Sequence, residues 1–207
     1  MCGRYYFDID DKELKEIADA AEKNLYDDYK TGEIYPTNIA PIHIEDDNNI
    51  KSILAKWGFP KWDNKGIIIN ARVETLYNKS MFKNLIDSKR CIIPASSFFE
   101  WKRDNCFKKT KEKYIFTRPD SLLYMAGLYN EITINENNKQ MSLFDNNTIQ
   151  KHIFFTIITK DANSSVSPVH NRMPLIFDKH EKDYWLDGGN MMELVSKNDV
   201  TLLSEHI

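Results

Sequence analysis

The clearest pattern of apolar and polar residues near the start of the chain is helical. Apolar side chains recur every three or four residues and would form one stripe on a helix: Leu14, Ile17, Ala18, Ala21 and Leu25. Asp10 lies just before this stripe, where its carboxylate can cap a helix, and Glu13 follows three residues later. The pattern predicts an amphipathic helix that begins after Asp10.

Two shorter helices are expected later in the chain. A helix over residues 79–88 would place four apolar side chains inward: Met81, Phe82, Leu85 and Ile86. Another should begin near Asp178, with Glu181 at the capping-box position and Trp185 on its packed face.

Most of the remaining apolar segments are short or alternate with polar residues, which is typical of β-strands. They cover residues 53–57, 66–70, 90–94, 98–102, 113–117, 122–130 and 152–159. Helices are too few and too dispersed to alternate with these strands as parallel βαβ units, so we expect a mainly antiparallel, barrel-like α+β fold with a few peripheral helices. Residues 135–147 predict a surface loop too short to divide domains, so residues 1–207 should form one domain.

The composition fits a globular protein and excludes several other classes. The 207 residues are 42% hydrophobic, and no apolar run approaches the roughly 20 residues of a membrane span. The first residues lack the apolar stretch of a secretion signal, so we expect a soluble intracellular protein. The three cysteines lack the number and spacing of a disulfide framework or a zinc site.

Charge is distributed unevenly along the chain. The formal net charge is −3, but residues 51–118 hold 16 Lys and Arg against 6 Asp and Glu. The rest of the chain holds 12 basic against 25 acidic residues. A basic middle inside an acidic protein suits a localised anion-binding face, although the same lysines could simply be solvated.

Cys2 offers unusual chemistry because it follows the initiator Met and is small enough for Met1 to be removed. A free N-terminal cysteine carries an α-amine with a pKa of about 8 beside a thiol with a pKa of about 8.5. An aldehyde can form a Schiff base with the amine, and the thiol can then close a five-membered thiazolidine ring. An internal cysteine cannot do this. The alternative is that a cysteine at this position is accidental.

Glu100 is a candidate for proton transfer. It lies in a predicted strand, with Phe99 and Trp101 on the opposite face. Apolar surroundings would raise the pKa of the carboxyl and suit a general acid or base. The alternative is an ordinary edge-strand glutamate paired with Lys102 or Arg103.

Other candidates end predicted strands or lie in stiff loops. Asn70 can donate a hydrogen bond to a sugar or carbonyl oxygen, and Arg72 can bind a phosphate. His170 lies between two prolines, in a stiff loop that follows an apolar strand. Catalytic groups concentrate in loops of this kind. Trp57 and Trp62 alternate with lysines, which suits stacking on bases beside phosphate contacts. Each candidate has a structural alternative. Asn70 and Arg72 could form a strand-ending turn, and His170 could be an ordinary surface histidine. The two tryptophans could belong to the core.

Seven short motifs, in their order along the chain, resemble those of the SRAP family, the SOS-response-associated peptidases or abasic-site processing proteins. They are MCGRY from residue 1, PTNIAP from residue 36, WG from residue 57, NARVET from residue 70, RCIIPA from residue 90, FFEWK from residue 98 and HNRMP from residue 170. Each motif is weak alone, but the ordered set is specific, and the resemblance covers residues 1 to about 177.

The resemblance implies a β-rich domain that binds single-stranded DNA and crosslinks to abasic sites, with no metal or organic cofactor. By motif position, Cys2 would be the nucleophile, Glu100 the acid/base, Asn70 the hydrogen-bond partner of the opened sugar, and His170 a proton-transfer group. The expected DNA-facing residues are Arg4, Asn38, Arg72 and Arg90, to which the stacking argument adds Trp57. In a bacterium the protein would be cytoplasmic and associated with the nucleoid during DNA damage. Partners at the replication fork stay open.

Two departures from the family pattern have consequences. Ser97 stands where the family usually has a glycine, in the stretch before Glu100. The family usually also has a longer segment after the helix with Trp185, so a final strand is expected to be shortened or replaced.

Three other functions stay open at this point. A thiol peptidase could use Cys2, Glu100 and His170, and removal of the chain's own first residue would be its natural task. A non-covalent single-strand binder would leave Cys2 idle. The N-terminal-nucleophile amidotransferases also begin Met-Cys-Gly, but they need a downstream Arg-Gly pair, which this chain lacks.

Overall fold

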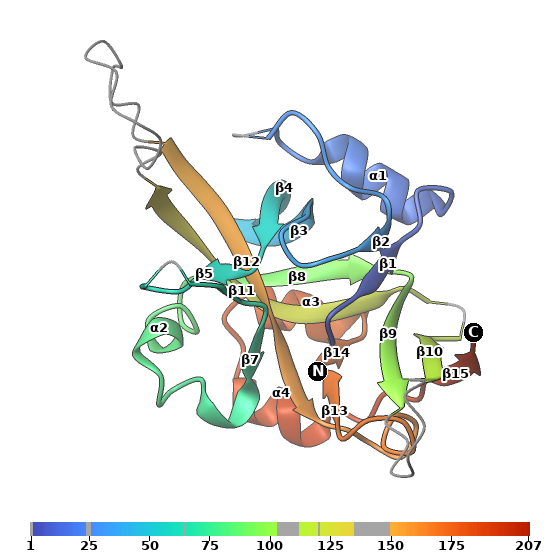
Figure 1. Ribbon diagram of the computed structural model, residues 1–207. Helices are drawn as coiled ribbons and strands as arrows, with labels where there is room; N and C mark the ends of the chain where they lie inside the picture. Colours follow the sequence, from blue (N-terminus) through green and yellow to red (C-terminus); the bar gives the residue numbers. More distant parts are fainter. Residues whose placement is uncertain (1, 24–25, 64, 103–111, 120, 135–149) are drawn as a thin grey trace.

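A closed β-barrel forms the centre of the structure, a computed structural model that describes residues 2–23, 26–63, 65–102, 112–119, 121–134 and 150–207 (Figure 1). Its five strands are β3 (Ile39–Asp46), β4 (Asn49–Trp57), β8 (Arg90–Ala95), β11 (Leu123–Ile134) and β12 (Gln150–Asp161). Neighbours pair antiparallel, except that β12 pairs with β4 in parallel. The predicted α+β barrel is confirmed. The predicted loop over residues 135–147 lies outside the described residues.

A second sheet of five strands carries the start of the chain. Its order is β15 (Leu203–His206), β10 (Glu112–Thr117), β9 (Ser97–Lys102), β1 (Tyr5–Phe7) and β2 (Gly32–Ile34). β1 pairs antiparallel with β9, and the Phe99 N–H donates to the Arg4 carbonyl. The residues just before β1 therefore lie beside the strand that carries Glu100. β15 pairs antiparallel with β10, and Ser97 takes a regular strand position opposite Tyr6.

Short elements bring two of the sequence motifs onto β12. After the hairpin of β5 (Phe59–Pro60) and β6 (Ile67–Ile68), β7 (Asn70–Arg72) runs parallel to β12 and leads into the 3-10 helix η1 (Val73–Thr75). β13 (Arg172–Pro174) pairs antiparallel with β12, and β14 (Ile176–Phe177) pairs with β11. The segments around residues 70 and 172 therefore share one strand as their support.

The first predicted helix is confirmed as α1 (Lys12–Ala20), with one correction. The capping residue is Asp11 and not Asp10, since the Asp11 carboxylate accepts the Leu14 N–H at 3.0 Å. The apolar stripe faces the core as expected, with Leu14, Ile17 and Ala18 buried. Leu25 lies outside the described residues.

The second predicted helix is shorter than expected. α2 spans only Ser80–Lys83, and turns continue to residue 88. Lys79 precedes the helix without a side-chain cap, so nothing local favours a longer helix. Phe82, Leu85 and Ile86 are nevertheless buried, because the turns present the same apolar side chains to the core.

The third predicted helix is confirmed as α3 (Lys179–Leu186). Asp178 and Glu181 form the predicted capping box, and Trp185 is buried with its indole N–H on the Cys91 carbonyl at 3.0 Å. α4 (Met191–Lys197) was not predicted, although Asn190 caps it. Within the described part of the chain, no helix is long and apolar enough to cross a membrane.

Trp57 corrects one predicted DNA contact. Its side chain is fully buried, its ring stacks on Phe155 with centroids 6.2 Å apart, and its indole N–H donates to the Ile69 carbonyl at 3.0 Å. A buried indole in this position cannot stack on a base without opening the barrel. The prediction was wrong because β4 turns this residue inward, which spacing between lysines does not reveal.

Arg90 corrects a second predicted DNA contact. Only 9% of it is exposed, and its guanidinium donates to three carbonyls: Ile86 at 2.6 Å, Trp185 at 3.2 Å and Gly189 at 2.7 Å. The guanidinium also lies over the Trp185 ring at 4.4 Å. Arg90 fastens the end of α3 and the turns after α2 to β8, so its role is structural.

Candidate active site

Cys2, Asn70, Glu100 and His170 come from distant parts of the chain and form two contacting pairs. The Asn70 Nδ2 group donates to the Cys2 carbonyl at 2.8 Å. The His170 Nδ1 atom lies 3.9 Å from the Glu100 carboxylate. The two pairs are linked electrostatically, because an ionised Glu100 carboxylate raises the pKa of the Cys2 thiol. Sequence reasoning therefore selected residues that the fold does bring together.

Asn70 is aimed by its strand. β7 lies parallel to β12 with Asn70 opposite Ile157, which directs the amide toward the start of β1. The Oδ1 atom of Asn70 is buried and has no hydrogen-bond partner among the described residues. A buried acceptor of this kind costs free energy unless a donor arrives, so it can receive a hydroxyl group of a bound molecule.

The Cys2 thiol is held in an uncharged state. Its side chain is fully buried, and Sγ lies 3.7 Å from the Arg4 carbonyl, which accepts its hydrogen. Burial raises the pKa of the thiol well above its usual range, and the nearby Glu100 carboxylate raises it further. The resting group is therefore a thiol and needs a base to become a nucleophile.

Glu100 has the surroundings of an acid/base group. It is 3% exposed, and burial raises the pKa of its carboxyl, while the His170 imidazole offsets part of that shift. Phe98, on the same face of β9, stacks on Phe116 with centroids 4.9 Å apart. The predicted partner Lys102 is exposed, and Arg103 lies outside the described residues. Within the described residues, the arrangement favours an acid/base role over an edge-strand ion pair.

His170 is fixed by the backbone that follows it. Its Nδ1 atom receives the Arg172 N–H at 3.0 Å and lies 3.1 Å from the Arg172 carbonyl. The side chain is 18% exposed, so it is not the free surface histidine of the alternative reading.

Arg4 and Asn38 are engaged in the protein itself. The Arg4 guanidinium pairs with Glu33 at 3.0 Å and lies between the Tyr35 and Trp101 rings, 4.3 and 4.8 Å from their centroids. The Asn38 side chain accepts the Tyr35 N–H at 2.9 Å and closes a turn. Arg4 connects Glu33 on β2 with Trp101 on β9, and Asn38 stabilises the turn before β3. Contact with DNA stays a prediction for each.

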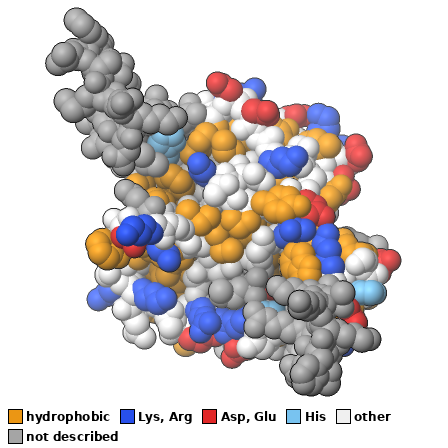
Figure 2. Space-filling model, viewed as in Figure 1, with side chains coloured by type: hydrophobic (Ala, Val, Ile, Leu, Met, Phe, Trp, Pro, Cys, Tyr) orange, Lys and Arg blue, Asp and Glu red, His pale blue; other side chains and the backbone are white. Residues whose placement is uncertain are grey.

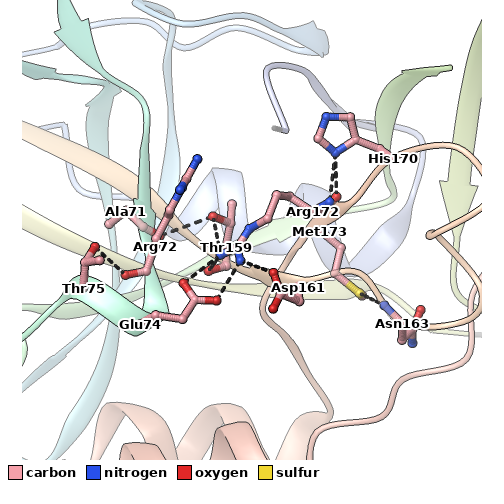
Figure 3. A network of polar contacts seen from close by, with 10 residues as sticks. All are labelled: Ala71, Arg72, Glu74, Thr75, Thr159, Asp161, Asn163, His170, Arg172 and Met173. Carbon is pink, nitrogen blue, oxygen red and sulfur yellow. Dashed lines mark hydrogen bonds and ion pairs between the residues drawn. The ribbon is translucent and has the colours of Figure 1, made fainter. Parts of the chain in front are cut away.

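An ion-pair network lies behind these residues, and sequence reasoning gave it no role. Arg172 is 7% exposed, and its guanidinium binds Glu74, Asp161 and Thr159 (Figure 3). Glu74 and Arg172 each stand in a quoted motif, but a pairing across 98 residues is invisible in one sequence. Arg72 is exposed, and its guanidinium points away from this network (Figure 3).

Exposed basic side chains gather near β5 and α2, where blue side chains are prominent at the left of Figure 2. The exposed members are Lys61, Lys65, Arg72, Lys79 and Lys83. Trp62 follows Lys61 in the chain and is 93% exposed, in contrast to the buried Trp57. This basic surface, defined by the five cations and Trp62, has the charge and the aromatic group that a nucleic acid strand requires.

A separate hollow of about 440 Å³ does not include the four site residues. It is lined by Glu22, Ile44, Asp46, Lys51, Ile53, Lys89, Tyr129, Glu131, Lys151 and Ile153. Its lysines pair with its own carboxylates, so it has no excess charge that would select a ligand. Among the described residues, no group of three or more His, Cys, Asp or Glu could hold a metal ion.

Comparison with known proteins agrees with the motifs. The family model described as SOS response associated peptidase (SRAP) matches residues 1–204. The abasic site processing protein YoqW of Bacillus subtilis is 35% identical over 204 residues, covering 92% of this chain and 82% of that protein. The abasic site processing protein YedK of Escherichia coli is 27% identical, covering 90% and 79%. A crystal structure from Bacteroides thetaiotaomicron has the same fold, with a TM-score of 0.74, 24% identity and coverage of 100% and 92%.

Proposed function

The chain belongs to the SOS response associated peptidase (SRAP) family, and from this premise we propose that it captures abasic sites in single-stranded DNA as a covalent adduct of Cys2. The names of its relatives support abasic-site processing. The observation that carries the covalent step is the grouping of Asn70, Glu100 and His170 around the second residue of the chain. A non-covalent binder would have no use for a buried acid/base pair at this position.

The first step of the proposed reaction is imine formation. After removal of Met1, the α-amine of Cys2 attacks the C1′ aldehyde of the opened sugar, and the carbinolamine loses water. Glu100 donates a proton to the departing hydroxyl, and burial, which raises the pKa of its carboxyl, favours the protonated form that this step needs. The Oδ1 atom of Asn70, which has no partner among the described residues, accepts from a sugar hydroxyl, and its Nδ2 group donates to the Cys2 carbonyl.

The second step closes the ring. Glu100, now ionised, takes the proton of the Cys2 thiol, whose raised pKa makes a base necessary. The sulfur then bonds to C1′, the electron pair of the C=N bond moves to nitrogen, and a thiazolidine results. His170, 3.9 Å from Glu100, can exchange protons with it between the two steps.

The simplest test uses a single-stranded oligonucleotide with one abasic site. The processed protein should give a heat-stable adduct on a denaturing gel and none with the intact oligonucleotide. Mass spectrometry of the adduct should show the loss of one water. A protein that loses Met1 but forms no adduct would contradict the proposed capture of abasic sites.

Arg72 is predicted to contribute to DNA affinity through a phosphate contact. Arg72→Gln should lower the slope of log K against log salt by about 0.7, because one counterion fewer is released from a single strand. Titrations of labelled single-stranded DNA at several salt concentrations measure this slope. Arg90→Gln is the control: it should leave the slope unchanged but lower the melting temperature, since Arg90 holds three buried carbonyls. An unaltered slope for Arg72→Gln would show that Arg72 does not contact a phosphate.

Trp62 is predicted to stack on a base. Trp62→Ala should weaken binding by about 1–3 kcal/mol, which is the usual value for one base–aromatic stack. The melting temperature should not change, because the side chain is 93% exposed. Trp62→Phe keeps an aromatic face and should recover most of the affinity. Equal affinity of the Trp62→Ala and wild-type proteins would exclude this contact.

A further inference from the structure

A groove lies between the turn that joins β3 to β4 and the end of α3. Two hollows, of about 340 and 200 Å³, share four lining residues and so form this one groove: Glu45, Asn48, Leu186 and Asp187. Ile50 and Tyr184 also line the larger hollow and are 46% and 43% exposed. Partly exposed apolar groups in a hollow with a polar rim are typical of contact surfaces.

The rim of this groove carries negative charge that its own side chains do not neutralise. Three carboxylates that line it form no ion pair within the described part of the chain: Glu45, Asp87 and Asp187. A fourth, Asp183, pairs with Lys182 at 2.6 Å. Among the described lining residues the one cation is Arg90, whose guanidinium is committed to three carbonyls. An occupant that complements this groove must therefore bring cations beside an apolar group.

The basic surface of the same chain carries a group of this kind. Trp62 lies between Lys61 and Lys65 in the sequence, and both lysines are exposed. The acid between them, Asp63, accepts the Lys65 backbone N–H at 3.0 Å. Because Trp62 is 93% exposed, it does not occupy the groove of its own molecule. The indole and the groove can therefore meet only between two copies of the chain.

We propose that Lys61, Trp62 and Lys65 of one copy dock in the acidic groove of a second copy. The uneven charge supports this pairing, because residues 51–118 hold 16 Lys and Arg against 6 Asp and Glu, while the rest of the chain holds 12 against 25. The contact joins two different surfaces, so each pair leaves one groove and one Trp62 free, and further copies can add. Trp62 also belongs to the surface proposed for DNA, so a single strand and a second copy compete for it.

Sedimentation equilibrium of the full chain without DNA tests this contact. At about 0.05 M salt the average mass should rise above the monomer mass of 24.3 kDa as the protein concentration increases, without a plateau at the dimer. The rise should shrink at about 0.5 M salt, because the charges of the two surfaces are then screened. A protein that stays monomeric up to about 1 mM at low salt would overturn the proposal.

Two variants remove one surface each. Trp62→Ala and Asp187→Lys should each weaken self-association at least about tenfold, as loss of a central interface residue does. Asp187 directly follows α3, where a lysine suits the helix dipole, so the variant should fold and melt like wild type. Glu16→Lys makes the same charge change on the exposed face of α1, outside the groove, and should associate like wild type. An equal loss for Glu16→Lys would assign the effect to net charge and contradict docking in the groove.

Mixing the two variants gives the sharpest test. Trp62→Ala keeps the groove and Asp187→Lys keeps the indole, so an equal mixture should form pairs although neither variant associates alone. These pairs should not grow further, because each member lacks the surface for the next contact. A mixture that stays monomeric would overturn the proposal.

A short strand tests the competition for Trp62. An intact single-stranded oligonucleotide of about six nucleotides, enough for one binding site, should convert the associated wild-type protein into complexes with one protein each. Asp187→Lys should bind this oligonucleotide as tightly as dilute wild type does. Self-association that persists with the oligonucleotide bound would overturn the shared use of Trp62.

Discussion

Cys2→Ser is expected to form no heat-stable adduct with abasic DNA, while an adduct should still be trapped by borohydride. Serine is also small, so Met1 should be removed and the α-amine should be free. The amine can then form the imine, which borohydride reduces to a permanent amine. A serine hydroxyl is a far poorer ring-closing nucleophile than a thiol with a base beside it. Without ring closure, the imine either hydrolyses or leads to strand cleavage by β-elimination.

A protein with Met1 retained is the control for this prediction. Its thiol is intact but its Cys2 nitrogen lies in a peptide bond, so neither a heat-stable nor a trapped adduct should form. Denaturing gels with and without borohydride compare the three proteins, and mass spectrometry verifies each N-terminus. If the protein that retains Met1 crosslinks as well as the processed one, the thiazolidine mechanism is wrong.

Glu100→Gln should slow crosslinking by about 10²- to 10⁴-fold, the usual contribution of a general acid or base. Glutamine keeps the size and much of the hydrogen bonding of the side chain, but it cannot transfer a proton. Single-turnover rates measure the change. DNA affinity should be nearly intact, because Glu100 is 3% exposed and lies inside the site.

Two controls distinguish a loss of catalysis from unfolding: the melting temperature of Glu100→Gln, and a variant of a second, exposed glutamate. Because burial raises the pKa of Glu100, its ionised form costs stability as the pH rises through that pKa. Glu100→Gln removes this cost and should melt no earlier than wild type at neutral pH. Glu205→Gln, an exposed change on β15, should alter neither rate nor melting. A rate within about twofold of wild type for Glu100→Gln would remove this residue from the mechanism.

The sequence by itself determined the elements whose signals are local. The apolar stripe of α1 and the capping box of α3 depend on residues within one or two turns of each other, and both are present. Short alternating segments predicted the barrel strands for the same reason. The end of α2 was misplaced because weak capping leaves the boundary to tertiary packing.

The sequence also selected the four residues at the candidate active site. Cys2 was identified by its position and chemistry, whereas Glu100, Asn70 and His170 needed the ordered motifs as well. Their distances were not available from the sequence, since strands β1, β7, β9 and β12 bring them together from positions up to 168 residues apart.

Only the tertiary structure decided which charged and aromatic side chains face the solvent. Trp57 and Trp62 lie five residues apart in the same lysine-rich stretch, yet one is fully buried and the other is 93% exposed. Arg72 and Arg90 look alike in the motifs, but Arg90 is committed to three carbonyls. Burial and pairing depend on residues far away in the sequence, as with Arg172 and Glu74, so the closure of the barrel sets the role of each arginine.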